Sequence, residues 1–189
     1  MFLNHSLDFT TFTASPLATD CALTPETLVE TPQGWRSADT LCIGDSVATL
    51  DGGFAPLTRL AQDTAQEPLW LLPGGTLDNC SDLILPGTQY VALDTPECQA
   101  LYDAPYVLAP IAAMAGFRNI QPAPQTVPQT IMRLGFAEEE VIYAQSGTLI
   151  HAPCDVVASG FFRRLNYGET RAALIMMNRG LCAPDRAAA

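Results

Sequence analysis

The sequence predicts an all-β domain, and two observations support this prediction. Short runs rich in Val, Ile, Leu and Thr alternate with turn signals that contain proline or glycine, a pattern typical of short strands. These turn signals lie at residues 32–34, 51–53, 73–75 and 86–87. The composition, 48% hydrophobic and 15% charged over 189 residues, is that of one soluble globular domain with a sizeable core.

The elements begin with a leader over residues 1–20, where Thr, Ser and Asp are frequent and no apolar period is sustained. We expect this leader to be flexible and the folded domain to span residues 21–154. Asp51, Gly52 and Gly53 form a tight-turn sequence, because glycine accepts a positive φ. The predicted strands are 27–31, 46–50, 56–60, 69–72, 83–85, 89–93, 106–108, 130–136, 140–144 and 148–151.

Three stretches depart from the strand pattern. Residues 110–116 predict a short internal helix, since proline stands in its first turn and glycine at its end. Residues 121–129 contain three prolines and predict an exposed loop. The tail, 155–189, predicts a helix near 168–179, which the glycine at position 180 can close.

Charge and residue usage exclude several classes of chemistry. The nine basic residues are all arginine, which excludes a phosphate-loop lysine and a Schiff-base lysine. A formal net charge of -11 disfavours nucleic acid as a partner. His5 and His151 are the only histidines, and none of the six cysteines forms a Cys-x-x-Cys pair, so we predict neither a metal site nor a cofactor.

The first ten residues lack the basic region and apolar run of a signal peptide. No stretch approaches the roughly 18 consecutive apolar residues of a membrane-spanning helix. We therefore expect a cytoplasmic protein with reduced cysteines and no membrane contact, although export by a non-classical route stays open.

The most informative stretch is 21–53: a cysteine before a strand, a turn, a short amphipathic step, and a second strand that ends in a tight turn. Twelve of its positions carry a recognisable pattern: Cys21, Thr24, Thr27, Val29, Thr31, Gly34, Leu41, Gly44, Asp45, Val47, Asp51 and Gly52. At this spacing the stretch resembles the N-terminal block of the Hint superfamily, the module of hedgehog autoprocessing domains and inteins.

Three later stretches extend the resemblance. Residues 82–93 are similar to the second block, where the family has Thr-x-x-His, or Ser-x-x-His in its bacterial subfamily. Residues 104–115 are similar to a helix-bearing stretch of the bacterial proteins, and 140–151 to the closing strands, which end in His-Asn in inteins. The resemblance implies a horseshoe-like β-fold.

The resemblance also implies a reaction of the chain on its own N-terminal segment. Cys21 would attack the carbonyl of Asp20 and convert that peptide bond into a thioester. In the family, a Thr and a His of the second block strain the bond and protonate its nitrogen. Water, a sterol or a second nucleophile then resolves the thioester, and splicing also needs a cyclising Asn.

The sequence departs from this pattern at decisive positions. Leu85 and Thr88 stand where the second block has Thr or Ser and His. His151 matches the penultimate histidine, but Ala152 replaces the cyclising Asn. Glu139 stands where the bacterial subfamily often has a histidine. We therefore predict no splicing, and N-terminal cleavage that is slow or absent, with Cys21, Thr88 and His151 as the candidate catalytic residues.

Two alternatives remain open. The chain can be a non-catalytic structural or protein-interaction module on a Hint scaffold, with an unknown protein partner. It can also be a thiol hydrolase that uses Cys21 and His151, although a histidine on a strand is more often structural. If the chain is an enzyme, it is at most a single-turnover, cysteine-dependent autoprotease.

Overall fold

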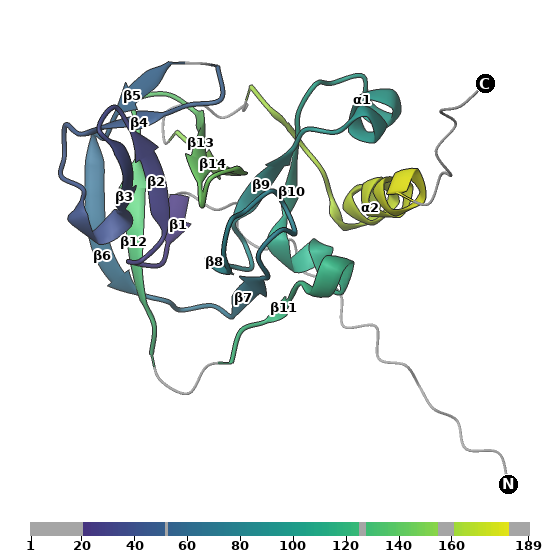
Figure 1. Ribbon diagram of the computed structural model, residues 1–189, viewed down its shortest axis with the longest axis horizontal. Helices are drawn as coiled ribbons and strands as arrows, with labels where there is room; N and C mark the ends of the chain where they lie inside the picture. The colour runs from purple at the N-terminus through teal and green to yellow at the C-terminus, as the bar shows by residue number, and fades with distance from the viewer. Residues whose placement is uncertain (1–20, 52, 125–127, 155–160, 182–189) are drawn as a thin grey trace, which may run out of the picture.

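The computed structural model describes residues 21–51, 53–124, 128–154 and 161–181, and over these the chain is mostly β, as predicted (Figure 1). The predicted leader lies outside the described residues. The strands are β1 (Cys21–Leu23), β2 (Leu28–Thr31), β3 (Gly34–Ser37), β4 (Ser46–Ala48), β5 (Phe54–Pro56), β6 (Arg59–Thr64), β7 (Leu69–Leu72), β8 (Leu83–Pro86), β9 (Tyr90–Leu93), β10 (Val107–Pro110), β11 (Gln121–Pro122), β12 (Thr130–Gly135), β13 (Glu140–Ala144), β14 (Thr148–Ala152) and β15 (Arg163–Arg164).

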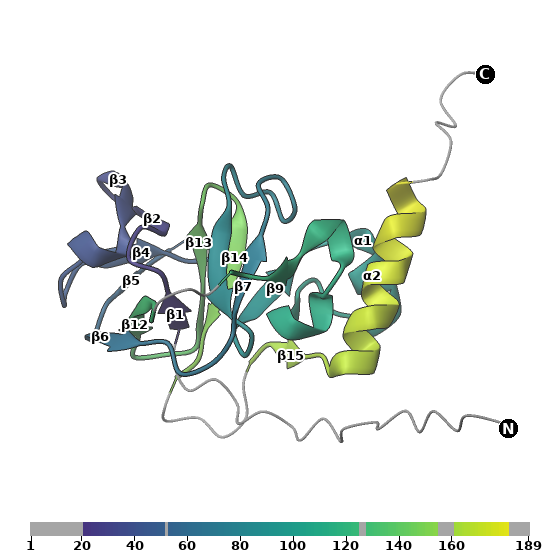
Figure 2. The same cartoon turned by 90° about the horizontal axis from the view of Figure 1, so that it is seen from below.

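Helical turns connect these strands. The two α-helices are α1 (Pro96–Tyr102) and α2 (Tyr167–Leu181), and the 3-10 helices are η1 (Ala38–Thr40), η2 (Ile111–Met114) and η3 (Phe117–Asn119). The α-helices lie side by side at one end of the molecule, and β3 lies at the other end (Figure 2).

The first strand and the closing strand belong to different sheets. β1 pairs with β12 in the sheet ordered β1-β12-β6. β14 lies in the middle of the seven-stranded sheet ordered β15-β10-β9-β14-β13-β2-β3. Because β1 packs against both β14 and β8, the beginning of the domain meets its closing strand in the interior.

The two faces of the seven-stranded sheet bury different clusters. Side chains of a strand alternate between faces, so residues two apart share a face. Ile150 and Ala152 of β14 belong to the main core cluster, which also contains Cys21. Leu149 belongs to a smaller cluster, against which Tyr90 packs. This alternation decides which residues of β14 can face the first strand.

The strand predicted over 56–60 is two strands in the structure, whereas the other predicted strands differ from the observed ones by at most two residues at an end. Instead of a single strand over 56–60, the chain forms β5, which pairs with β4, and β6, which pairs with β12. Between them Leu57 is buried and its N–H donates to Asp45 O at 2.8 Å, whereas the N–H of Thr58 donates to Gly135 O at 2.9 Å. The chain changes sheets at this point, which its local apolar pattern does not signal.

The helices differ from the predictions in type and number. The short helix predicted at 110–116 is the 3-10 helix η2, and the predicted C-terminal helix is confirmed as α2 with slightly wider bounds. Helix α1 was not predicted, although the Thr95 side chain accepts a hydrogen bond from Cys98 N at 3.3 Å and proline follows at the first turn. Within the stretch predicted as a loop, β11 pairs with β7, and residues 125–127 lie outside the description.

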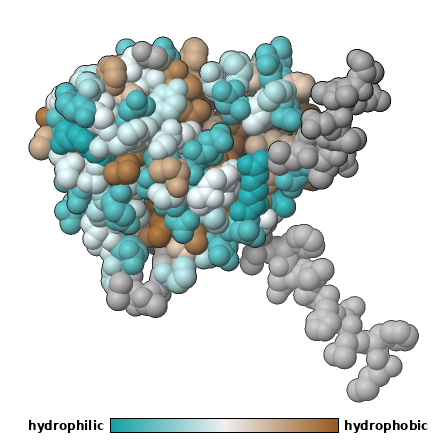
Figure 3. Space-filling model, in the orientation of Figure 1, coloured by the Kyte–Doolittle hydropathy of each residue, from teal (hydrophilic) through white to brown (hydrophobic). Residues whose placement is uncertain are grey.

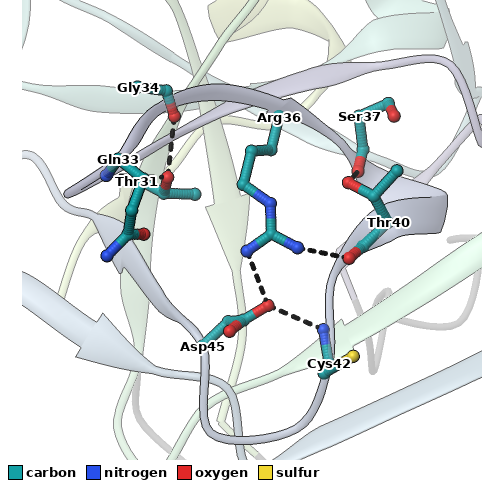
Figure 4. A network of polar contacts seen from close by, with 8 residues as sticks. All are labelled: Thr31, Gln33, Gly34, Arg36, Ser37, Thr40, Cys42 and Asp45. Carbon is teal, nitrogen blue, oxygen red and sulfur yellow. Dashed lines mark hydrogen bonds and ion pairs between the residues drawn. The ribbon is translucent and has the colours of Figure 1, made fainter.

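A polar network fixes the loop between β3 and β4 (Figure 4). Arg36 donates to Asp45 Oδ2 at 2.9 Å and also to the Thr40 carbonyl. The same Asp45 oxygen accepts from Cys42 N at 2.9 Å, and this bond, followed by the Arg36 guanidinium, lowers the pKa of Asp45. These contacts account for Asp45 in the N-terminal pattern. Gly44 in the same loop takes φ +93°, which accounts for a glycine at that position of the pattern.

The β13–β14 turn lies so close to residue 78 that position 147 requires glycine. A Cβ at Gly147 would lie 2.6 Å from Asp78 O and 2.9 Å from Asp78 Cβ. We expect Gly147→Ala to lower the free energy of unfolding by about 1–3 kcal/mol in urea denaturation. Gly53→Ala is the control, since its Cβ would be 3.6 Å from the nearest atom, and it should change stability by less than about 0.5 kcal/mol. Equal stabilities of the two variants would contradict this packing.

The face shown in Figure 3 is largely hydrophilic, with apolar residues in small separate patches. Within the described parts of the chain, no helix has the length and apolar character needed to cross a membrane.

Candidate functional site at the start of the domain

Cys21 is the first residue of β1 and is fully buried. It pairs with Leu134 of β12 and belongs to the main core cluster. Leu85 and Ala152, two positions that depart from the family pattern, are buried in the same cluster. The site around Cys21 is thus an apolar interior where the second block and the closing strand both contribute side chains.

Gln89 is the polar side chain that links this first strand to the closing strand. It is only 1% exposed, and its Oε1 accepts from Ala22 N at 2.9 Å. Its Nε2 donates to His151 O at 2.7 Å and to Tyr90 O at 3.1 Å. One amide therefore satisfies backbone groups on β1, β9 and β14, directly beside the residue that the resemblance implies as nucleophile.

Sequence reasoning overlooked Gln89, although the sequence contained a signal. Gln89 precedes Val91 and Leu93 by two and four residues, and both of these belong to the main core cluster. In a strand this spacing puts all three side chains on one face. A glutamine on an apolar face needs hydrogen-bond partners, which marks it as a candidate for a specific contact.

Thr88, the residue proposed from the sequence, makes its hydrogen bonds elsewhere. Its hydroxyl donates to Glu67 Oε1 at 2.7 Å and its N–H donates to Glu67 Oε2 at 3.2 Å. The side chain is half-buried, and its hydroxyl proton is already engaged by a carboxylate. A catalytic role for Thr88 stays a prediction.

His151 lies on the other face of the closing strand. It stands between Ile150 and Ala152, which face the main core, and its ring meets Tyr90 edge-on at 6.2 Å between centroids. Its Nε2 lies 2.7 Å from Glu139 Oε1, which also accepts from Arg164 at 3.0 Å. The structure thus places the Gln89 side chain on the residue after Cys21 and Ala152 in the same buried cluster as Cys21, whereas the His151 imidazole lies on the opposite face of β14.

Burial strongly affects the charge states of the paired side chains of His151 and Glu139. Desolvation lowers the pKa of His151, despite the hydrogen bond that His151 donates to the Glu139 carboxylate, which acts in the opposite direction. Burial alone would raise the pKa of Glu139, but hydrogen bonds from His151, Phe161 N and Arg164 lower it overall. Near neutral pH the pair is therefore a neutral imidazole beside a carboxylate.

This lowered pKa predicts how stability depends on pH. Unfolding returns the imidazole to an ordinary pKa of about 6.5, so the unfolded chain binds a proton that the folded chain excludes. The stability that neutral His151 contributes is present above that pH and lost as pH falls toward the lower folded pKa, by at most about 1.4 kcal/mol per pH unit.

Urea denaturation of the unchanged chain and His151→Gln, at pH 7.5 and 5.5, measures this effect. The unchanged chain should lose more stability on acidification than the variant, because only the unchanged chain carries this imidazole. An equal loss in both proteins would show that His151 titrates in the folded state as it does in the unfolded state.

No metal centre is evident among the described residues, where no group of three His, Cys, Asp or Glu side chains is placed to bind an ion.

Comparison with known proteins agrees with this architecture. The sequence model of the Hint domain matches residues 21–149. A splice-inactive variant of the AceL NrdHF class 3 split intein has a similar structure, with TM-score 0.50 and 10% identity over 72% of this chain and 100% of its own.

Two further structures are similar at lower TM-scores. The bacterial intein-like domain from Clostridium thermocellum gives 0.49, with 12% identity over 69% of this chain and 97% of its own. A variant of the MchDnaB-1 intein gives 0.46, with 13% identity over 69% of this chain and 98% of its own. No curated protein sequence matches the chain. Since the family match begins at Cys21 and covers more than half of the sequence, the chain belongs to the Hint domain family.

Proposed function

We propose that this chain is a self-processing Hint domain whose reaction at Cys21 has become slow because the site lacks a proton donor. In the reaction, the Cys21 thiol loses its proton, Sγ attacks the carbonyl carbon of Asp20, the C–N bond breaks, and the departing Cys21 nitrogen takes up one proton, so that the step has no net gain or loss of protons. The product is a thioester between residue 20 and the Cys21 side chain, which water or an added nucleophile cleaves to release residues 1–20.

The observation that carries the proposal is the position of Gln89. Its side chain holds Ala22 N, one residue beyond the bond that would break, and so lies where a second-block histidine could assist. A carboxamide can accept and donate hydrogen bonds, but it cannot transfer a proton near neutral pH. Loss of general acid catalysis typically slows such a step by about 10²- to 10⁴-fold.

Splicing is not part of the proposed function. Ala152 has no side-chain amide to attack its own carbonyl, and its side chain faces the main core with Cys21. The chain beyond Ala152 should therefore stay attached during incubation, and a product that ends at His151 or Ala152 would contradict this prediction.

A non-catalytic scaffold is the second candidate, and the hydrogen bonds that Thr88 and His151 make to other residues favour it. The Thr88 hydroxyl donates to Glu67, and the His151 ring is paired with Glu139 on the opposite face. On this alternative, Gln89 is purely structural and Cys21 is an ordinary buried cysteine.

Hydroxylamine, which cleaves thioesters, separates the two candidates. The self-processing proposal predicts slow release of residues 1–20, seen by intact mass, and none from Cys21→Ala. The scaffold alternative predicts that the mass of neither protein changes after days of incubation.

A further inference from the structure

The buried pair of His151 and Glu139 is covered by a short segment from the C-terminal part of the chain. This 161–164 segment contains β15, a two-residue strand at the edge of the seven-stranded sheet, which pairs in parallel with β10. Phe162 packs on the smaller core cluster, the one on the His151 face. His151 and Glu139 side chains are consequently only 2% and 8% exposed.

Glu139 fastens this segment at two points. Its Oε2 accepts from Phe161 N, and its Oε1 accepts from Arg164 at 3.0 Å. Oε1 is also the atom that contacts His151 Nε2. The group that orients the histidine is therefore the group that holds the covering segment in place.

The attachment changes character after residue 164. Leu165 is 1% exposed, its N–H donates to Leu108 O at 2.8 Å, and it joins the main core cluster. Helix α2 follows and packs on α1, η2 and β10, with Ala173 and Leu174 in the same cluster. In contrast, Phe161 is 89% exposed, and the only regular pairing of the segment is the two-residue ladder to β10.

We propose that the 161–164 segment is a latch that opens locally, with Leu165 and α2 as its fixed end, and that Glu139 is its catch. Short edge elements with few buried contacts open at lower free energy than the core elements to which they are attached. Opening admits solvent to a neutral imidazole already oriented by a carboxylate, a pair able to accept a proton from water or from a thiol.

Two buried nitrogen atoms at this site have no hydrogen-bond partner within the described part of the chain, which supports local opening of the segment. Among the described side chains, His151 Nδ1 and Arg164 Nε are buried without a hydrogen-bond partner. Leaving a buried polar atom unpaired disfavours the closed state, so local opening relieves a cost that a purely structural contact would avoid.

Diethylpyrocarbonate, which modifies accessible neutral imidazoles, tests the latch when followed by peptide mass spectrometry. In the unchanged chain His151 should react slowly. Arg164→Met removes one of the two fastenings to Glu139 and should speed modification of His151 by at least about tenfold, the factor expected for a lost charged hydrogen bond. The helix signal in circular dichroism should not change.

Arg163→Met is the matched control, because Arg163 is the neighbouring residue of β15 but its guanidinium contacts Glu169, at 3.1 Å, and the Tyr102 ring, at 4.8 Å from its centroid, rather than Glu139. It should leave the His151 rate unchanged. An Arg164→Met protein that stays folded and reacts no faster than the unchanged chain would overturn the proposal, and so would an equal acceleration by Arg163→Met.

Hydrogen exchange on the unchanged chain gives a second test that does not depend on any variant folding. The latch predicts that the amides of 161–164 exchange faster than those of Leu165 and α2. If both exchange at one common rate, the segment does not open separately from the helix and the proposal fails.

Discussion

Gln89→His is expected to release residues 1–20 much faster than the unchanged chain does. An imidazole at this position can accept from Ala22 N through one nitrogen and donate through the other, so it can keep the bridge that Gln89 makes between β1 and β14. In its protonated form both nitrogens carry a proton, so the nitrogen that accepts from Ala22 N in the neutral form can instead give a proton to the departing nitrogen of Cys21, which the carboxamide cannot do. Intact mass spectrometry should show a new fragment that begins at Cys21.

Thr88→His is the control that locates the effect. Position 88 is half-buried and its side chain is turned toward Glu67, so a histidine there should pair with that carboxylate and produce no cleavage. Cys21→Ala in the Gln89→His background must abolish the fragment. If Thr88→His cleaves and Gln89→His does not, the residue that faces the scissile bond has been assigned to the wrong position.

Gln89→Leu is expected to be among the most destabilising single changes in the domain. Leucine has similar bulk but neither donor nor acceptor, so Ala22 N and His151 O lose their partners in an interior position. Each buried group left without a partner costs about 1–3 kcal/mol, which gives a total loss of about 2–6 kcal/mol for the two groups in urea denaturation.

Thr88→Val provides the comparison for this loss. It removes one half-buried hydroxyl that donates to Glu67, and it should cost about 1 kcal/mol. If the two variants are equally stable, Gln89 does not hold the first strand to the closing strand, and the structural basis for its functional role disappears.

The sequence was sufficient for the fold class because the signals for it are local. Alternating residues and turn signals predicted β7 and β13 with the bounds they have, and the spacing from Cys21 to Gly52 indicated the family. Helix α1 was missed although its capping threonine and proline are adjacent in the sequence. This helix has only 7 residues and lies between two predicted strands, so its short apolar pattern did not stand out from theirs.

The site was harder to predict from the sequence than the fold, because its contacts join positions far apart in the chain. Thr88 and Gln89 are neighbours, and a shift of one residue in a strand exchanges the two faces of a sheet. Only the tertiary contacts with Ala22 and His151 show which of the two faces the interior. Likewise, the sequence placed His151 on a strand, but its direction depends on the pairing of β14 and on Glu139, 12 residues away.

The most direct test of the central claim is the ratio of two cleavage rates at pH 7 in hydroxylamine, those of Gln89→His and of the unchanged chain, each corrected with its Cys21→Ala counterpart. The claim is that the scaffold still positions the bond before Cys21 and lacks only a proton donor at position 89. It predicts a ratio of about 10² to 10⁴, with slow but Cys21-dependent cleavage in the unchanged chain. A ratio near one in folded proteins would contradict it.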